Sequence, residues 1–153
     1  MQICSFIGHK NCPIEIRNCL LHTLEELILD KKVNLFYVGT QGDFDKMVYE
    51  VLCDLEKKHK IEVFVVLAYL NRVHEHTYYD VKKTIFPDEL TKTPPRFAIR
   101  RRNSLMIDKS HYIVSYLNTP LSNTCGNVEE AIRKKKQIIN LGDYDIKCIG
   151  QSK

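Results

Sequence analysis

Basic side chains that can bind an anion follow the first apolar segment of the chain. His9 and Lys10 come directly after Gly8, at the end of a run with the pattern of a buried strand. A lysine at this position can neutralise a phosphate, and a histidine can donate a hydrogen bond or titrate near neutral pH. The same two residues would be equally ordinary in a solvent-exposed turn. The sequence is therefore compatible with an anion-binding site here but does not require one.

A second basic cluster lies in the middle of the chain and is rich in arginine. It consists of Arg96, Arg100, Arg101, Arg102 and the amide residue Asn103. Helical spacing places Arg96, Arg100 and Asn103 on one face of a predicted helix, whose start is fixed by two prolines. Arginine forks match the geometry of phosphate oxygens, although a solvated basic face explains some of these charges equally well. RNA binding would need exposed aromatic residues among the basic ones, a pattern that the sequence does not show.

Carboxylates lie near the starts of two predicted helices. Asp43 is expected to cap backbone N–H groups, whereas Asp45 could either cap the same helix or accept a hydrogen bond from a ribose hydroxyl. Glu129 and Glu130 are predicted in the first turn of a later helix, where they would complement the helix dipole. A carboxylate beside a ribose could also stabilise the oxocarbenium-like charge that develops when an N-glycosidic bond breaks. Both interpretations of these carboxylates stay open.

Strand and helix patterns alternate along the chain and position these residues. Short apolar segments predict strands at residues 2–7, 35–38, 61–67, 112–117 and 137–141. Apolar residues recurring every three and four positions predict helices at residues 13–30, 43–56, 97–109 and 127–136. A candidate edge strand follows at residues 146–149. Residues 70–95 break the alternation and are predicted to form an irregular insertion, of a length that is usually functional or partly mobile.

This alternation predicts one Rossmann-like α/β domain spanning residues 1–153, with its core at 2–141. We expect an open, mostly parallel sheet of about five strands, with helices on both faces. In such sheets a ligand binds outside the carboxyl ends of the strands, where the strand order reverses. The turns predicted at that edge contain the glycines Gly8, Gly39, Gly42 and Gly126. Glycines also serve tight turns, but their gathering at one edge favours a binding crevice.

Composition narrows the class of protein. The chain is 44% hydrophobic and 27% charged, with a net charge of +4, values that suit a globular protein and do not require nucleic acid as a partner. No apolar run approaches the length of a membrane span, and the N-terminus does not resemble a secretory signal. These features predict a cytoplasmic protein that does not enter the membrane.

The six cysteines are predicted to be reduced, because no Cys-x-x-Cys pair or secretory signal accompanies them. Cys4, Cys19 and Cys53 fall in apolar patterns, where a buried thiol behaves as a small hydrophobic group. His74 and His76 are two residues apart and would point away from each other on a strand or helix. We therefore predict no metal site and no cofactor.

The assembled motifs resemble those of the SLOG superfamily, the Rossmann-like group that includes DprA-like and LOG-like proteins, and especially its small single-domain bacterial members. Gly8-His9-Lys10 is similar to their Gly-His-Arg turn, and residues 39–45 to their glycine-rich turn ending in Gly-x-Phe-Asp. Residues 94–103, with Met106 and Asp108, resemble their longest motif. The likeness covers about residues 2–141. It implies a Rossmann-like fold and a nucleotide or nucleotide-derived ligand.

LOG-type enzymes of this superfamily release a base from a nucleoside monophosphate, and two of their motifs resemble parts of this chain. Residues 102–106 match Arg-Lys-x-x-Met except that Asn103 replaces the lysine. Gly126 and Glu130 match Pro-Gly-Gly-x-Gly-Thr-x-x-Glu, whereas residues 122–124 replace its Pro-Gly-Gly and Asn127 its threonine. The resemblance implies that Glu130 would stabilise the sugar cation and that Arg102 would orient the phosphate or sugar.

The leading hypothesis is a domain that binds or senses a nucleotide-like small molecule. Its predicted ligand-binding residues are Gly8, His9, Lys10, Gly39, Gly42, Asp45, Arg100, Asn103, Gly126 and Asn127. The alternative is a phosphoribohydrolase with Glu130 and Arg102 as catalytic residues. A third hypothesis is a scaffold whose insertion at residues 70–95 contacts a protein partner. A homodimer is also compatible with the resemblance, because LOG-like proteins pair through helices beside the site.

Overall fold

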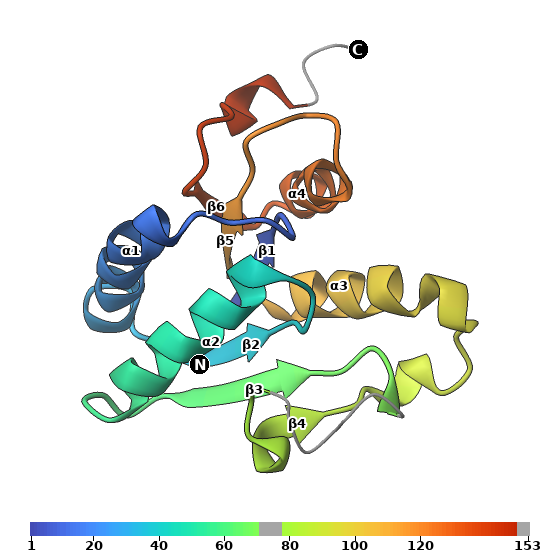
Figure 1. Ribbon diagram of the computed structural model, residues 1–153, viewed down its shortest axis with the longest axis horizontal. Coiled ribbons are helices and arrows are strands. Elements are labelled where there is room, and N and C mark those ends of the chain that lie inside the picture. The colour runs from blue at the N-terminus through green and yellow to red at the C-terminus, as the bar shows by residue number, and fades with distance from the viewer. Residues whose placement is uncertain (71–77, 150–153) are drawn as a thin grey trace.

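The computed structural model describes residues 1–70 and 78–149. At its centre is a six-stranded sheet in which every neighbouring pair of strands is parallel (Figure 1). The strands are β1 (Gln2–Gly8), β2 (Val33–Val38), β3 (Glu62–Val66), β4 (Thr84–Ile85), β5 (Tyr112–Tyr116) and β6 (Gln137–Asn140). Their order across the sheet is β4-β3-β2-β1-β5-β6. The predicted α/β class and Rossmann-like arrangement are confirmed.

The sheet has one strand more than the five expected. β4 has two residues and pairs with the end of β3, Val65 opposite Thr84 and Val66 opposite Ile85. It lies inside the insertion at 70–95, which also contains short 3₁₀ helices at Val81–Lys83 and Asp88–Leu90. A strand of two residues is too short to show periodicity, so the sequence pattern could not predict it. His74 and His76 lie outside the described residues.

Four α-helices connect the strands: α1 (Arg17–Leu29), α2 (Asp43–Glu56), α3 (Ala98–Lys109) and α4 (Asn123–Arg133). α1 and α2 contact each other, as do α3 and α4. The chain moves outward from β1 through β2 and β3, and then returns to β5 on the other side of β1. Because crossovers between parallel strands are right-handed, this reversal puts α3 and α4 on the opposite face from α1 and α2. The predicted helices on both faces are therefore present.

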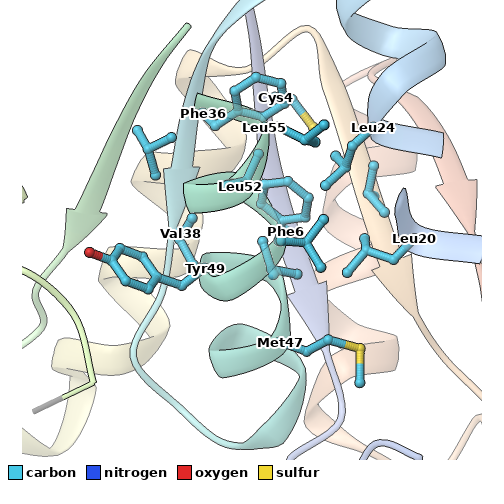
Figure 2. Close-up of a cluster of buried hydrophobic side chains, with 14 of the residues drawn as sticks. Cys4, Phe6, Leu20, Leu24, Phe36, Val38, Met47, Tyr49, Leu52 and Leu55 are labelled. Atoms are coloured by element: carbon cyan, nitrogen blue, oxygen red, sulfur yellow. The ribbon is translucent and has the colours of Figure 1, made fainter. Parts of the chain in front are cut away.

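Two hydrophobic clusters hold these layers together. The larger one lies between the sheet and helices α1 and α2, where Leu20 and Leu24 meet Phe6, Phe36 and Leu52 (Figure 2). Its members come from the apolar helix positions and strand interiors that the periodicity indicates. The smaller cluster joins the sheet to α3 and α4 and includes Ile7, Ile107, Ile113, Leu117, Val128 and Ala131. Burial on both faces explains the nearly continuous apolar sequence of the central strands.

Helix α4 begins four residues before the predicted start at residue 127, and this corrects two expectations. The side chain of Ser122 caps the helix by accepting a hydrogen bond from the backbone N–H of Cys125 at 3.2 Å. Gly126 is consequently a helical residue and not part of a turn. Glu129 and Glu130 lie beyond the first turn, which contains no acidic residue. The N-cap signal of Ser122 was available in the sequence, but Gly126 suggested a turn in its place.

Three smaller predictions also need correction. Residues 146–149 do not form an edge strand, because Ile146–Cys148 is a 3₁₀ helix capped by Asp145, whose side chain accepts from the backbone N–H of Lys147. Helix α1 starts later than residue 13, after the 3₁₀ helix Ile14–Ile16. Cys19 is exposed, whereas Cys4 is buried. Cys4, Cys12, Cys19, Cys53 and Cys125 are free thiols. None of the helices within the described ranges is both long and apolar enough to cross a membrane.

Candidate functional site

The loops after β1, β2 and β5 meet at the carboxyl edge of the sheet. β1 lies between β2 and β5, and Gly8 at its end is the register partner of Tyr116 at the end of β5. The strand order reverses between β1 and β5, which is where Rossmann-like domains bind ligands. The loops therefore lie together at one edge of the sheet, as predicted, but only some of their side chains face an open space.

The end of β1 is covered by the protein itself. A Cβ atom on Gly8 would lie 2.1 Å from Cδ2 of Phe44, so the Phe44 ring occupies the space directly over this glycine. The same ring stacks on Tyr116, with 6.1 Å between the ring centroids. Phe44 is completely buried. Gly8 thus permits close packing of α2 on β1, and the ring of Phe44 stands where a ligand would have to approach it.

His9 is tied to the loop that follows β5. Its Nε2 accepts a hydrogen bond from the backbone N–H of Asn118 at 2.9 Å, and its ring meets Tyr116 edge-on. Partial burial lowers the pKa of His9 below its usual value, which favours the neutral, accepting form. His9 therefore joins the β1 and β5 loops. The Asn118 bond uses the lone pair of Nε2, so any donation to a ligand would have to come from Nδ1.

Lys10 and Gly42 fix the start of helix α2. The carbonyl oxygen of Lys10 accepts a hydrogen bond from the backbone N–H of Asp43 at 2.7 Å. Gly42 has φ +94°, and a Cβ atom there would lie 2.6 Å from Cα of Lys10. Only glycine adopts this conformation without strain and allows the two loops to come so close. The side chain of Lys10 is exposed at the surface of this junction.

Asp45 is buried beneath the loop after β2 and does not point into an open crevice. Only 8% of the residue is exposed, and its Oδ2 accepts a hydrogen bond from the backbone N–H of Gln41 at 2.8 Å. Burial raises the pKa of Asp45 to about 6, while the nearby Arg102 guanidinium acts in the opposite direction. A Cβ atom on Gly39 would lie 2.8 Å from the same Oδ2. The carboxylate thus holds the loop before α2, since Gln41 precedes the N-cap residue Gly42.

Arg102 is the largest fully buried side chain of the described structure, with 1% of the residue exposed. Its Nη1 donates to Thr40 Oγ1 and to the carbonyl oxygen of Val66, both at 3.1 Å. Its Nε donates to Oδ1 of Asn103 at 2.9 Å. These bonds connect α3 to the ends of β2 and β3. The guanidinium is therefore enclosed by protein, and it is not placed to touch the phosphate or sugar of a ligand.

An open cavity of about 650 Å³ lies between α3 and α4. Arg100 and Asn103 line it from α3, and Gly126, Asn127 and Glu130 line it from α4. A Cβ atom on Gly126 would have nothing within 4 Å, which shows how open the α4 side is. These five predicted residues are brought together. Arg102 lies on α3 outside the cavity lining, and the remaining predicted residues lie at or beside the β1 and β2 loops. Arg102 joins the two groups, because it donates to Asn103 and to Thr40.

The cavity is also lined by residues that were not predicted to belong to the site: Arg96, Ile99, Ser122, Asn123, Glu129 and Arg133. Arg96 and Ile99 share the helical face of Arg100 and Asn103, so their spacing was a usable signal. Ser122 and Asn123 were hidden by the misplaced start of α4. Arg133 follows Glu129 by one helical turn and pairs with it, Nη1 lying 3.9 Å from Oε1.

Glu130 is held in place from both sides. Ser104 Oγ donates to Glu130 Oε1 at 3.0 Å, and Lys134 Nζ lies 2.6 Å from Oε2. Lys134 also pairs with Asp108, and 16% of the Glu130 side chain is exposed. The carboxylate thus has a fixed orientation, one turn along α4 from Gly126. Of the two groups that hold it, Ser104 belongs to α3 and Lys134 directly follows the last residue of α4.

The comparisons with known proteins add no assignment. The sequence matches no protein-family model and no curated protein.

Proposed function

We propose that the cavity between α3 and α4 binds a nucleotide or a nucleotide-derived small molecule. The observation that carries this proposal is the division of the cavity into two chemically different walls. The wall formed by α3 and the turn before it carries Arg96, Arg100 and Asn103, and we call it the donor wall. The wall formed by α4 carries Glu129 and Glu130, together with Arg133, which pairs with Glu129, and we call it the acceptor wall after its two carboxylates.

A nucleotide suits these walls because it has both kinds of complementary group. Its phosphate accepts hydrogen bonds and carries the negative charge that arginine forks recognise. Its ribose hydroxyls can donate to carboxylates. The volume of about 650 Å³ lies in the range of small-molecule sites. The position at the carboxyl side of a Rossmann-like sheet and the motif likeness to SLOG proteins both support the same ligand class.

Binding can be tested with purified protein and a panel of nucleoside mono-, di- and cyclic phosphates. We expect at least one of them to raise the melting temperature and to give a saturable isotherm in calorimetry. Arg100→Gln should weaken that binding roughly tenfold, because it removes a charged donor from the cavity. Arg101→Gln is the matched control, since Arg101 is the exposed neighbour on α3 and does not line the cavity. Absence of binding by the entire panel would overturn the proposal.

A second candidate function is hydrolysis of the N-glycosidic bond of a nucleoside monophosphate. The oriented carboxylate of Glu130 favours it, because a fixed negative charge beside the ribose would stabilise a sugar cation while water attacks C1′ and the base leaves. Chromatography of incubated nucleoside monophosphates would detect the free base and ribose 5-phosphate. Glu130→Gln should abolish this release, whereas Glu129→Gln, on the same wall, should retain most of it.

In this second function Arg102 would act indirectly, because its guanidinium is buried and bonded to Thr40, Val66 and Asn103. A scaffold that uses residues 70–95 to bind a protein is the remaining alternative, and it would gain if no nucleotide binds while a partner co-purifies through that segment. The homodimer and the cytoplasmic location stay predictions.

A further inference from the structure

The side-chain amide of Asn103 has one defined orientation. Arg102 Nε carries a hydrogen and can only donate, so the atom 2.9 Å away must be the amide oxygen of Asn103. Rotating the amide by half a turn would bring two donors face to face. The amino group of Asn103 is therefore directed away from Arg102. Which way the amide faces follows from this bond alone.

Arg102 is itself unable to turn. It is 1% exposed, and its Nη1 is held by the hydroxyl of Thr40 and the carbonyl oxygen of Val66. These acceptors belong to the loop after β2 and to the end of β3, which are parts of the sheet edge. Because Arg102 is held at the sheet edge, its Nε keeps the amide of Asn103, which lines the cavity, in one orientation.

The amino group of Asn103 completes a row of donors. Arg96, Arg100 and Asn103 follow one another at helical spacing and all line the cavity. Guanidinium groups donate and never accept, and Arg102 takes one of the two lone pairs of the Asn103 amide oxygen. Within residues 1–70 and 78–149, the Asn103 amino group donates no hydrogen bond to another protein group. It is also not a buried atom that lacks a partner, so it remains accessible from the cavity. This row of donors suits an oxyanion, which can accept several hydrogen bonds at once.

We propose that Arg102 is a positioning residue that turns the amide of Asn103 into a fixed donor for an oxyanion on the donor wall. The choice of ligand rests on the proposed function: in a bound nucleotide, this oxyanion is the phosphate. The phosphate then lies against α3, beside Arg100, and the sugar is left facing the carboxylates of α4.

Asn103→Asp tests the assignment with almost no change of shape. The new carboxylate still accepts from Arg102 Nε, so the melting temperature of the free protein should not fall. It replaces the amino group by an acceptor, however, so binding of inorganic phosphate and of the 5′-nucleoside monophosphates should weaken roughly tenfold to hundredfold. Asn123→Asp adds the same charge to the opposite wall and measures the effect of charge alone, which should be several-fold smaller. Unphosphorylated nucleosides should lose much less affinity for the Asn103→Asp protein.

A spectroscopic readout separates positioning from general stability. The side-chain ¹H–¹⁵N signals of Asn103, identified by their absence in the Asn103→Asp spectrum, should shift when the wild-type protein is titrated with inorganic phosphate. In Arg102→Met these signals should move in the free protein and respond less to phosphate, because the amide is no longer oriented. The Asn103→Asp result stands if Arg102→Met does not fold.

The outcomes distinguish this inference from the proposed function. If nucleotides bind and Asn103→Asp binds them as tightly as wild type, the inference is wrong while the function survives. If phosphate binds and shifts the Asn103 signals but no nucleotide binds better than phosphate, the donor wall is supported and the nucleotide ligand is excluded. If neither phosphate nor any nucleotide binds, both proposals fail.

Discussion

The ring of Phe44 occupies the position that a side chain on Gly8 would need, with Cδ2 only 2.1 Å from where a Cβ atom would lie. Gly8→Ala should therefore force the start of α2 away from β1. We expect a loss of about 1–3 kcal/mol in the free energy of unfolding, the usual cost of overpacking a rigid core. Urea denaturation followed by circular dichroism would measure it.

The partner substitution identifies the cause of that loss. Phe44→Ala removes the obstructing ring, so Gly8→Ala should cost much less in the Phe44→Ala background than in the wild type. A coupling of about 1 kcal/mol or more in this double-mutant cycle would confirm the contact. Additive effects would instead indicate that Gly8 is needed for its backbone conformation.

Gly42 and Gly126 should respond to alanine in opposite directions. Gly42 has φ +94° and sits against the backbone of Lys10, so Gly42→Ala should destabilise the protein by about 1–3 kcal/mol. Gly126 lies in helix α4 with open space around it, and Gly126→Ala should stabilise the protein by roughly 0.5 kcal/mol through helix propensity. Thermal denaturation of both variants would test the pair. A stabilised Gly42→Ala protein would contradict the close approach of the two loops.

Some features of this fold could be predicted from the sequence and others could not. Apolar periodicity located the strands and helices because both faces of the sheet are buried, and strand β4 escaped it only through its shortness. Gly8, Gly39 and Gly42 lie near the meeting point of the loops after β1 and β2, whereas Gly126 lies inside α4. Glycine spacing could not show that Phe44, the second residue of α2, fills the space over Gly8, since that contact depends on how α2 packs across β1.

Arg102 illustrates a second limit of sequence reasoning. In the sequence it is one of three consecutive arginines, and nothing local distinguishes it from its exposed neighbour Arg101. Helical phase within α3 decides which arginine faces the sheet, and a shift of one residue in the helix start would exchange them. Asn123 was missed for a different reason, because the predicted start of α4 lay four residues too late. Residue type indicated which side chains could bind an anion, and tertiary packing decides which of them line the cavity.

Arg102→Met should be strongly destabilising. It removes the donor that Nη1 supplies to Thr40 and to the Val66 carbonyl, and it removes the positive charge near the buried Asp45. We expect a loss of about 3 kcal/mol at pH 7, a typical cost of removing one member of a buried charged group. Arg101→Met should change stability by less than about 0.5 kcal/mol, as most surface substitutions do. Equal effects at the two positions would mean that Arg102 is not enclosed.

The buried carboxyl of Asp45 should make stability depend on pH. Its pKa is raised from the ordinary value of 3.8 to about 6, chiefly by burial, against the opposing charge of Arg102. Between these values the folded protein keeps a proton that the unfolded chain has lost. Unfolding then releases a proton, so the contribution of Asp45 to stability is complete below about pH 3.8 and is lost as the pH rises through about 6.

Asp45→Asn isolates this contribution, because asparagine can still accept the Gln41 hydrogen bond but does not titrate. Relative to Asp45→Asn, the free energy of unfolding of the wild type should fall by about 2–3 kcal/mol between pH 4 and pH 7. Urea denaturation of both proteins at several pH values would give this difference, and Asp43→Asn, at an exposed carboxylate one residue before Phe44, controls for the general effect of charge. If the free energy of unfolding of the wild type instead rises relative to that of Asp45→Asn as the pH increases, the charge of Arg102 outweighs burial. Asp45 would then be a charged partner of the guanidinium across this pH range.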